Sequence, residues 1–577
     1  MPDQGESNLR LTSVPPPLPP RSGSGKPAAL YSGDDRWKVQ TIRGTGAVYL
    51  YGPELDLVDA PEFQRLQGIK QLGTTYFVFR GAVHTRFEHS LGTLQKAEQI
   101  VQAVNRGDGG VKIDPVGHRV ARLAALLHDL PHVPFGHTLE DEFGLLDRHD
   151  ENQPRLSALL EEGKIGDVLR DSLDQKERSM LFAVLGLRAK GAGGVGDGAD
   201  KEVELARRLG DYAYVADIVA NTVCADLLDY IVRDLSACGM PVALGDRFLD
   251  FFDISPADAA NEANRNRMAL RLYKRGMPRP DVESEIIKLL TYRYELAERV
   301  FFHHAKNAAS VMIGEAVRRL RLHERDANFR DLSDDLLLAV LKEPRIGKPL
   351  GLRMPKVEPE DREVASQLAG LVERRSLFKL GYLGVSDDDT ERRAGDIYRK
   401  WGDVEGRVAL QNELAERAGL TPSEVLVHLP DPNMMAKLAR VRVLLERDNV
   451  VTFEEWEERH SGRVEALNRA HERLWRIAVY LHPNAYENKA ARRLVGSAAR
   501  ELFGIRPRYA EPELDQPYIA TVFDLHSKEK NWNIDREEAI HAAAKAAASS
   551  SMPKSLDAAI ALMDAVVQDL TQEGGGH

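Results

Sequence analysis

Apolar residues recur at intervals of three and four along most of the chain, the spacing of an amphipathic helix. The pattern is clearest between residues 114 and 129, where one face carries Val116, Val120, Leu123, Ala124 and Leu127. The same spacing predicts helices over residues 90–104, 211–236, 283–321, 332–342 and 537–570. The hydrophobic pattern therefore predicts a mainly α chain.

Alternating or continuous short apolar runs are fewer, and they predict strands. Residues 46–51 follow a glycine-rich turn and predict a short strand, and residues 76–79 predict a brief extended segment. Beyond residue 355 the helical periodicity weakens, and the runs 477–481 and 518–523 predict strands with helix between them. We expect a helical core followed by a smaller C-terminal α+β region.

Changes in composition suggest three parts. Residues 1–35 are polar and contain a proline-rich run, which predicts a disordered or polyproline-like leader, with a proline-rich ligand for another domain as the alternative. The helical core then spans residues 36–350 and the α+β region residues 351–577. Glycine-rich residues 191–198 predict a surface loop. The alanine-rich terminal helix is either a plain surface helix or a contact between subunits.

Charge and cysteine content narrow the function classes. A formal net charge of -11 argues against broad coating of nucleic acid, although a local basic pocket could still hold phosphates. The two cysteines, Cys224 and Cys238, exclude a disulfide framework or a cysteine zinc site and fit a reducing compartment. We find no signal pattern and no apolar run of membrane-spanning length, so we expect a cytoplasmic protein without a membrane partner.

The stretch from Leu126 to His137 carries the most concentrated chemistry. His128 and Asp129 are adjacent, and two prolines then bring His132 and His137 close behind them. Adjacent side chains on a helix point about 100° apart, so both reach one ion only from the last turn. Pro131 predicts that the helix ends there, because proline disfavours the helical conformation of the preceding residue. This stretch predicts a metal site beside reacting groups.

His89 and Asp226 complete a candidate set of four ligands with His128 and Asp129. Imidazole and carboxylate suit a divalent metal, but they do not select among Mg, Mn, Fe, Zn, Co and Ni. Each residue taken alone could have a purely structural role, since a single histidine is usually hydrogen-bonded on the surface or in the core. Asp226 is expected inside a helix over residues 221–236, and an aspartate in such a position is usually solvated. The combination of all four favours the metal site.

Longer motifs around these residues resemble a known family. The motifs are residues 63–66 (FQRL), 69–73 (IKQLG), 86–92 (RFEHSLG), 128–137 (HDLPHVPFGH) and 228–234 (LDYIVRD). In this order they resemble the HD-domain phosphohydrolases, and most of all the deoxynucleoside triphosphate triphosphohydrolase branch, over about residues 38–322. The resemblance implies an HD-domain helical core, a divalent metal on the four ligands, a nucleotide substrate and a homo-oligomer.

The resemblance also implies a catalytic set beside the metal. In the family, the histidines that match His132, His137 and His149 lie around the phosphates. The match to Glu140 is an acidic residue that pairs with a histidine, so we expect Glu140 to orient His149 as the proton donor. The alternative for Glu140 is membership of a solvated acidic run.

Arg86 lies one helical turn before His89, where its guanidinium could hold phosphate oxygens in a bidentate manner. The alternative is an ion pair with Glu88 or with a neighbouring helix. On the strength of the motif we expect the phosphate contact.

Substrate contacts follow from the same resemblance. Tyr230 and Asp234 come four and eight residues after Asp226, so the three share one helix face. The resemblance places Tyr230 beneath the sugar ring and Asp234 at the 3′-hydroxyl, which would favour 2′-deoxy nucleotides. Gln71 and Leu72 match positions that line the sugar and base. The alternative for Tyr230 is a core tyrosine with a bonded hydroxyl.

The sequence departs from the family at two cationic positions. Leu227 stands where a lysine or arginine usually follows the last metal aspartate, and His304 stands where a later helix usually carries a basic residue. Lys306 or Arg299 could compensate. Each charged hydrogen bond contributes roughly 1.5–3 kcal/mol, so two missing cations weaken a triphosphate site.

Regulated members of the family carry an activating nucleotide site, which this sequence matches only in part. Lys38, Asp59 and Gln64 agree with it, but Gln67 replaces its arginine and residues 42–46 replace its characteristic loop. We therefore do not expect activation by a guanine nucleotide in that manner.

The predicted function is metal-dependent hydrolysis of deoxynucleoside triphosphates to deoxynucleoside and triphosphate. Cleavage between the 5′ oxygen and the α-phosphorus requires charge neutralisation, an activated water and a proton for the leaving oxygen. One alternative, favoured by Leu227, is a phosphomonoesterase or phosphodiesterase of the same fold. Others are a nucleotide-sensing protein without catalysis and, against the negative net charge, a nuclease. The sequence does not distinguish the base, or nucleotide-pool control from defence against phage.

Overall fold

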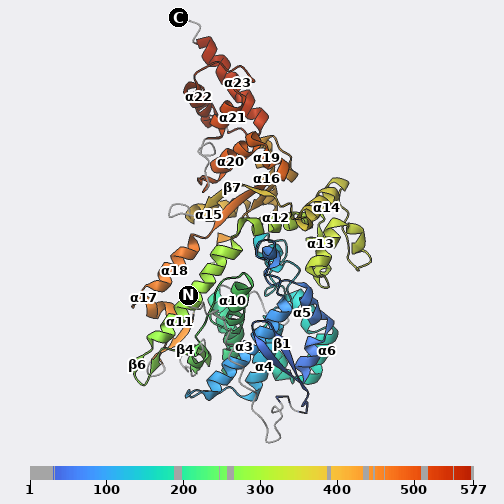
Figure 1. Cartoon of the computed structure of the whole chain (residues 1–577), viewed down its shortest axis with the longest axis vertical. Coiled ribbons are helices and arrows are strands. Elements are labelled where there is room, and N and C mark those ends of the chain that lie inside the picture. The colour runs from blue at the N-terminus through green and yellow to red at the C-terminus, as the bar shows by residue number, and fades with distance from the viewer. Residues whose placement is uncertain are drawn as a thin grey trace, which may run out of the picture.

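The computed structural model is mainly helical, as predicted (Figure 1). It describes residues 30–31, 33–186, 198–245, 247–255, 266–385, 391–432, 441–445, 449–460, 462–508, 517–549 and 552–573. In Figure 1 the helical body occupies the lower half and the C-terminal α+β unit the upper half. No helix among these residues combines the length and the apolar character needed to cross a bilayer.

The helical body is built around α3 and α4, which pack against each other. Its helices are α1 (Pro53–Val58), α2 (Pro61–Gln64), α3 (Arg86–Arg106), α4 (Pro115–Leu127), α5 (Gln153–Leu160), α6 (Gly163–Ser172), α7 (Gln175–Val184), α8 (Gly198–Leu209), α9 (Ala213–Val219), α10 (Ala225–Ala237), α11 (Pro280–Leu296), α12 (His304–Arg319) and α13 (Asp334–Lys342). The hairpin β1 (Trp37–Ile42) and β2 (Gly46–Tyr51) lies against this body, and β2 confirms the first predicted strand.

The C-terminal unit is a three-stranded antiparallel sheet covered by helices. Its strands are ordered β7 (Lys379–Val385), β11 (Arg476–Leu481) and β8 (Val425–His428). Its helices are α14 (Pro359–Glu373), α15 (Glu391–Trp401), α16 (Val404–Ala418), α19 (Pro483–Glu487), α20 (Lys489–Phe503), α21 (Tyr518–His526), α22 (Arg536–Ser549) and α23 (Leu556–Glu573). The predicted strand at 477–481 is confirmed as β11.

The two faces of this sheet belong to two different cores, because side chains alternate along a strand. On β11, Ile477 and Val479 pack with the C-terminal helices. Ala478 and Tyr480 pack on the other face, in a core that includes α12 and the loop after His132. The sheet therefore joins the C-terminal unit directly to the neighbourhood of the predicted site.

The expected boundary at residue 350 is wrong for one returning segment. Strand β9 (Arg442–Leu444) pairs in parallel with β4 (Arg267–Arg271) of the helical body, in a sheet ordered β10 (Val450–Thr452), β9, β4 and β3 (Phe252–Ser255). Helices α17 (Phe453–Glu458) and α18 (Arg463–Glu472) follow, and α18 packs against α11. A second small hairpin joins β5 (Tyr273–Lys274) to β6 (Met277–Pro278). Strands β9 and β10 and helices α17 and α18 thus belong to the helical body.

Two predicted extended segments are helical. Residues 518–523 lie in α21, where Tyr518, Ile519, Val522 and Phe523 pack into the C-terminal core at helical spacing. Their β-branched and aromatic character favours a strand, but tertiary burial overrides this weak local preference. Residues 73–77 form a 3₁₀ turn, and the amides of Val78 and Phe79 bond back to the Thr75 carbonyl. The extended prediction for residues 76–79 is therefore also wrong.

The long helix predicted over residues 211–236 is broken in two. It ends at Val219 and resumes at Ala225, and Asn221 bonds locally to the Thr222 amide and to Asp217. Such side-chain bonds compete with helical hydrogen bonding. Asp226 consequently lies in the first turn of α10 and not inside a helix. The helix predicted over 283–321 is likewise interrupted, by a π-helical turn at Ala297–Phe301, before His303 caps α12.

Three smaller expectations also need revision. The terminal helix predicted over 537–570 is two helices, α22 and α23. Tyr31, expected in the leader, is buried and donates a hydrogen bond to Glu54. Asp59 and Glu62 have the spacing of a capping box, which would start a helix at Asp59, but the N-cap of α2 is Ala60, which makes no side-chain bond. Most of the leader and of the glycine-rich loop at 191–198 lies outside the described residues.

Candidate active site

The four predicted metal ligands come from three helices that pack together. His89 lies in the first turn of α3, which a capping box of Thr85 and Glu88 starts. His128 caps the C-terminus of α4, so Asp129 follows in the turn, as the proline pattern predicted. Asp226 comes from the first turn of α10. Because α3 packs against both α4 and α10, the three helix ends meet.

The donor atoms of these residues converge. The Nε2 atoms of His89 and His128 are 3.3 Å apart, and Asp226 Oδ1 is 3.0 Å from the first and 3.7 Å from the second. Asp129 oxygens lie 3.5 Å from the His128 Nε2 and 3.7 Å from the His89 Nε2. Ligand atoms each about 2.0–2.2 Å from one ion lie roughly 3–3.7 Å apart. His89, His128 and Asp226 therefore fit a single divalent ion, and Asp129 lies beside them, in a second group with His132 and His149.

Both histidines are held in the tautomer that binds a metal through Nε2. His89 Nδ1 is 2.9 Å from Asp229 Oδ2, and His128 Nδ1 is 2.8 Å from the Ala125 carbonyl. A proton on each Nδ1 satisfies these acceptors and leaves the Nε2 lone pair for the ion. Metal-binding histidines in proteins usually have such a partner.

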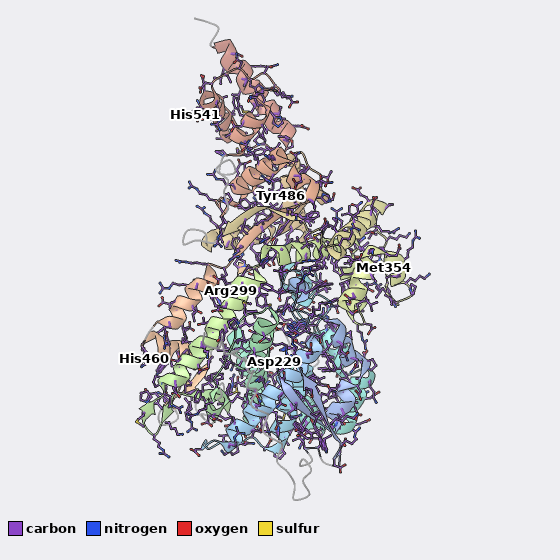
Figure 2. The ribbon with its side chains drawn as sticks, viewed as in Figure 1. Asp229, Arg299, Met354, His460, Tyr486 and His541 are labelled. Carbon is purple, nitrogen blue, oxygen red and sulfur yellow. The ribbon has the colours of Figure 1, made fainter. Side chains whose placement is uncertain are left out.

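Asp229 contacts the predicted ligand His89, although the sequence patterns assign it no role. Arg233 holds it through two hydrogen bonds of 2.8 Å, one to each carboxylate oxygen (Figure 2 labels Asp229 within the helical body). A Cβ at Gly92 would lie 2.0 Å from Asp229 Oδ1, so only glycine lets the two helices approach this closely. Arg233 also donates to the hairpin turn at Arg43 and Thr45. The spacing of Asp229 and Arg233, four residues, was the available signal.

The charges on the four predicted ligands and their neighbours favour the binding of a cation. Burial opposes protonation of His89, but its hydrogen bonds to Asp226 and Asp229 raise its pKa to about 10. Despite burial, Arg86 and His128 hold the pKa of Asp129 well below its usual range. The carboxylates of Asp129 and Asp226, which lie nearest the two imidazoles, are thus ionised at neutral pH, as a metal site requires.

Arg86 forms an ion pair with the predicted ligand Asp129. It is buried, and its Nη1 donates to Asp129 Oδ2 at 2.5 Å. The alternative of an ion pair with a neighbouring element is therefore found, and the phosphate contact stays a prediction. The guanidinium lies where it can fix the orientation of Asp129.

A second group, of three histidines, lies beside the metal ligands. The rings of His132 and His149 are stacked with centroids 3.6 Å apart, and His137 lies 5.1 Å and 6.0 Å from them. His132 Nε2 is 3.3 Å from Asp129 Oδ1, which links the two groups. We call His132, His137 and His149 the histidine group. Their exposure is graded, from 1% for the side chain of His132 to 53% for that of His137.

Glu140 sits between the histidines and is fully buried. Its Oε2 is 3.2 Å from His149 Nδ1, and its Oε1 accepts a hydrogen bond of 2.9 Å from Arg155. Burial opposes protonation of His149, but the hydrogen bond and the charge of Glu140 raise its pKa. Burial and the charges of Arg86 and His149 hold the pKa of His132 well below its usual value. A protonated His149 next to a neutral His132 is therefore the favoured state.

Known proteins match this part of the chain. Residues 86–233 match the HD domain model and residues 283–513 match the model of the HD associated region. The chain carries an HD domain. The matched range contains all four predicted metal ligands, the histidine group and Glu140, and several relatives of the chain are named deoxynucleoside triphosphate triphosphohydrolases.

Relatives of this chain come from organisms that are distant from one another. YwfO of Bacillus subtilis is 30% identical over 47% of this chain and 52% of its own length. The uncharacterized protein MJ1154 of Methanocaldococcus jannaschii is 28% identical over 50% and 52%. Chicken deoxynucleoside triphosphate triphosphohydrolase SAMHD1 is 27% identical over 59% of this chain and 56% of its own. The chain thus spans about half the length of the curated relatives it matches.

Two of the predicted substrate-binding residues, Tyr230 and Asp234, lie on α10, and Gln71 and Leu72 lie just before the 3₁₀ turn at residues 73–77. Tyr230 is partly buried, and burial raises the pKa of its hydroxyl well above the usual value. Asp234 is buried and lies 2.7 Å from His84 Nε2, a partner that sequence reasoning missed. Leu72 is buried, and Gln71 Oε1 is a buried oxygen without a hydrogen-bond partner among the described residues. An unpaired buried acceptor of this kind is unusual and suits a ligand donor.

The compensating cations proposed from the sequence are not at the site. Lys306 is buried in an ion pair with Glu142, so the expectation that it replaces the missing cation is wrong. Arg299 is exposed on the π-helical turn before α12 (labelled in Figure 2). Leu227 packs into the main hydrophobic core. Arg293 of α11, in contrast, lies close enough to Tyr230 that its charge partly opposes the pKa rise of that hydroxyl.

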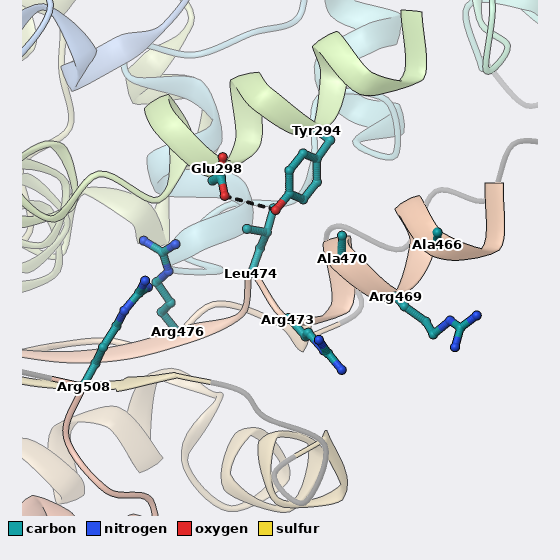
Figure 3. A pocket seen from close by; sticks show the side chains of 9 residues that line it. All are labelled: Tyr294, Glu298, Ala466, Arg469, Ala470, Arg473, Leu474, Arg476 and Arg508. Carbon is teal, nitrogen blue, oxygen red and sulfur yellow. Dashed lines mark hydrogen bonds between the residues drawn. The ribbon is translucent and has the colours of Figure 1, made fainter. Parts of the chain in front are cut away.

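A separate pocket lies outside the HD match. It has a volume of about 470 Å³ between α11 and α18, and Figure 3 shows that arginines supply much of its lining, namely Arg469, Arg473, Arg476 and Arg508. None of the predicted site residues lines it. The chemistry-bearing residues therefore define the candidate active site, and this pocket does not.

Proposed function

We propose that the protein is a metal-dependent nucleotide phosphohydrolase that converts deoxynucleoside triphosphates to deoxynucleosides and triphosphate. One observation carries the proposal: a four-residue site for a divalent ion shares Asp129 with a histidine group that holds a buried His149–Glu140 pair. The dNTP triphosphohydrolase names of several relatives support the substrate class.

The ion would be held by His89, His128, Asp129 and Asp226. When bound, it would neutralise charge on the α-phosphate and lower the pKa of a water molecule. The chain's own contribution is orientation. Asp229 and the Ala125 carbonyl fix the imidazoles, and Arg86 fixes Asp129.

His149 is the proposed proton donor to the leaving 5′ oxygen. Its Nδ1 faces Glu140, so Nε2 remains the atom that donates to the substrate. Glu140 stabilises the imidazolium, and Arg155 holds the other Glu140 oxygen through a hydrogen bond of 2.9 Å. General acid catalysis of this kind contributes roughly 10²–10⁴-fold to the rate.

The polyphosphate would lie toward the exposed side of the histidine group. His137 is exposed there and pairs with Asp141, which also binds Arg148. Arg293 is the proposed cation in place of the family's basic residue at position 227. Tyr230, Asp234, Gln71 and Leu72 would contact the nucleoside, and the His84 bond would orient Asp234.

Product analysis tests the proposal. Purified protein is incubated with each dNTP and Mg²⁺ or Mn²⁺, and the products are resolved by ion-exchange chromatography. Deoxynucleoside with intact triphosphate is the expected result. Inorganic phosphate with a nucleoside diphosphate would instead favour the phosphomonoesterase alternative, to which the buried Leu227 points. Binding without any product would favour a sensing protein.

A further inference from the structure

The residue that orients the proposed proton donor lies on a short turn with little structure of its own. Glu140 belongs to a single π-helical turn, Thr138–Glu142, which we call the Glu140 turn. Its backbone is closed by the Phe143 amide on the Thr138 carbonyl and the Leu145 amide on the Leu139 carbonyl. One turn of helix is unstable in isolation, so contacts from elsewhere must fix its position.

The inner side of this turn faces the active site, and its outer side faces the C-terminal unit. Glu140 points inward to His149 and Arg155. Glu142, two residues later, points outward and forms a buried ion pair with Lys306 of α12. His428 of β8 lies 3.9 Å from the other Glu142 oxygen.

Arg407 of α16 makes the most direct contact from the C-terminal unit. It is 5% exposed, its Nη1 donates to the Glu142 carbonyl, and its guanidinium lies over the Phe143 ring, 5.5 Å from the centroid. Phe143 in turn packs against α12 where only a glycine fits, since a Cβ at Gly314 would lie 2.7 Å from the ring. The last residues of the Glu140 turn are therefore clamped between α12 and α16.

Packing reinforces the clamp. Leu139 and Phe143 share one hydrophobic core with Leu426 and Tyr480 of the C-terminal sheet. Helix α12 packs against both the Glu140 turn and β8, at the junction visible in the middle of Figure 1. Helix α12, helix α16 and the C-terminal sheet, each more than a hundred residues from the turn in sequence, thus pack around it.

Stability alone does not explain a charged clamp. Replacing a buried ion pair with apolar residues of similar volume is often neutral or stabilising, whereas buried charges fix a unique geometry in some proteins. Here the cluster contains one carboxylate, Glu142, and two cations, Lys306 and Arg407, all less than a tenth exposed. It lies directly behind the residue whose position matters most for proton transfer.

We propose that the C-terminal unit is part of the catalytic apparatus, with Arg407 as a positioning residue that holds the Glu140 turn and thereby aligns Glu140 with His149. The proposal rests on the proposed function, because it assigns His149 as proton donor. Arg407 touches neither metal ligands nor substrate residues in the structure and acts only through the turn.

The test compares Arg407→Met with a matched control on the same helix. Arg417 is equally buried on α16, but it bonds to Glu413 and Glu501 and lies over Tyr518, all within the C-terminal unit. Arg407→Met should lower kcat by about tenfold or more with KM changed less than about threefold, since a small displacement of a catalytic group costs rate more than binding. Arg417→Met should leave kcat within about twofold.

A second readout does not depend on activity. Hydrogen–deuterium exchange of residues 138–149 should accelerate in Arg407→Met and not in Arg417→Met, at temperatures where both remain folded. Arg407→Lys, a milder change, should give an intermediate loss of kcat. Equal kcat and equal exchange in the Arg407 and Arg417 variants would overturn the proposal. If the wild-type protein hydrolyses no nucleotide, the proposed function fails, and the exchange comparison still decides the clamp.

Discussion

The metal ligands and the histidine group lie side by side and share Asp129, yet they are fixed in different ways. Three of the four residues that we assign to the ion have a further partner: Asp229 behind His89, the Ala125 carbonyl behind His128 and Arg86 beside Asp129. The histidine group grades from the buried His132 to the exposed His137, and its central pair depends on a single short turn. We infer that the metal end is held by partners next to its own residues, whereas the proton-transfer end depends on the contacts that fix the Glu140 turn.

The largest expected effect comes from removing a metal ligand. Asp226→Ala leaves the ion without one carboxylate, and we expect bound metal to be lost and kcat to fall by at least about 10³-fold, because the metal supplies several kcal/mol. Metal content by mass spectrometry and initial rates measure both effects. Glu204→Ala serves as control, because this partly exposed carboxylate on α8 pairs with Arg207 and with none of the four predicted ligands. An Asp226→Ala protein with full metal content and wild-type rates would remove Asp226 from the ligand set.

The next effect separates the two groups. His149→Ala should lower kcat by about 10²–10⁴-fold because the leaving oxygen loses its proton donor. Metal content and nucleotide binding, measured by calorimetry, should persist, since His149 is not one of the four ligands. A variant that turns over at the wild-type rate would show that another group donates the proton.

A smaller effect tests how the hydrogen bond from His89 to Asp229 supports metal binding. Asp229→Asn keeps the size of the side chain but weakens the bond to His89 Nδ1, and we expect metal affinity to fall by about 10–100-fold. Activity should recover at high metal concentration, which a titration with Mn²⁺ would show. Failure to recover at saturating metal would mean that Asp229 does more than orient the imidazole.

The smallest expected effect is a shift in the pH dependence of kcat, through the His149–Glu140 pair. Glu140 raises the pKa of His149, so His149 stays protonated, and able to donate, to higher pH than a free histidine. Glu140→Gln removes the negative charge, lowers that pKa and should move the alkaline limb of kcat to lower pH. A pH–rate series compares the two proteins. An unchanged limb would assign it to another group.

Much of the metal site could be predicted from the sequence, because the His128–Asp129 pair and the prolines after it fix a helix end locally. The helix over residues 114–129 and the strands at 46–51 and 477–481 follow from periodicity in the same way. The contacts of Asp229 with His89 and of His84 with Asp234 could not be identified, since these partners are distant in sequence and the local spacing of Asp229 and Arg233 indicates only an ion pair on one helix. Tyr518 and its neighbours have strand-like side chains, but burial on helical spacing decides their structure. The return of strands β9 and β10 and helices α17 and α18 to the helical body depends on pairing between β9 and β4, which local patterns do not show.

The position of the bond that breaks is the central claim, and isotope labelling measures it directly. Hydrolysis of a dNTP in water enriched in ¹⁸O, followed by mass spectrometry of both products, reports which atom accepts the water oxygen. Attack at the α-phosphorus predicts one ¹⁸O in the triphosphate and none in the deoxynucleoside. Label in inorganic phosphate, or in the deoxynucleoside, would contradict the assignment of the metal ligands and His149 to cleavage at the 5′ oxygen.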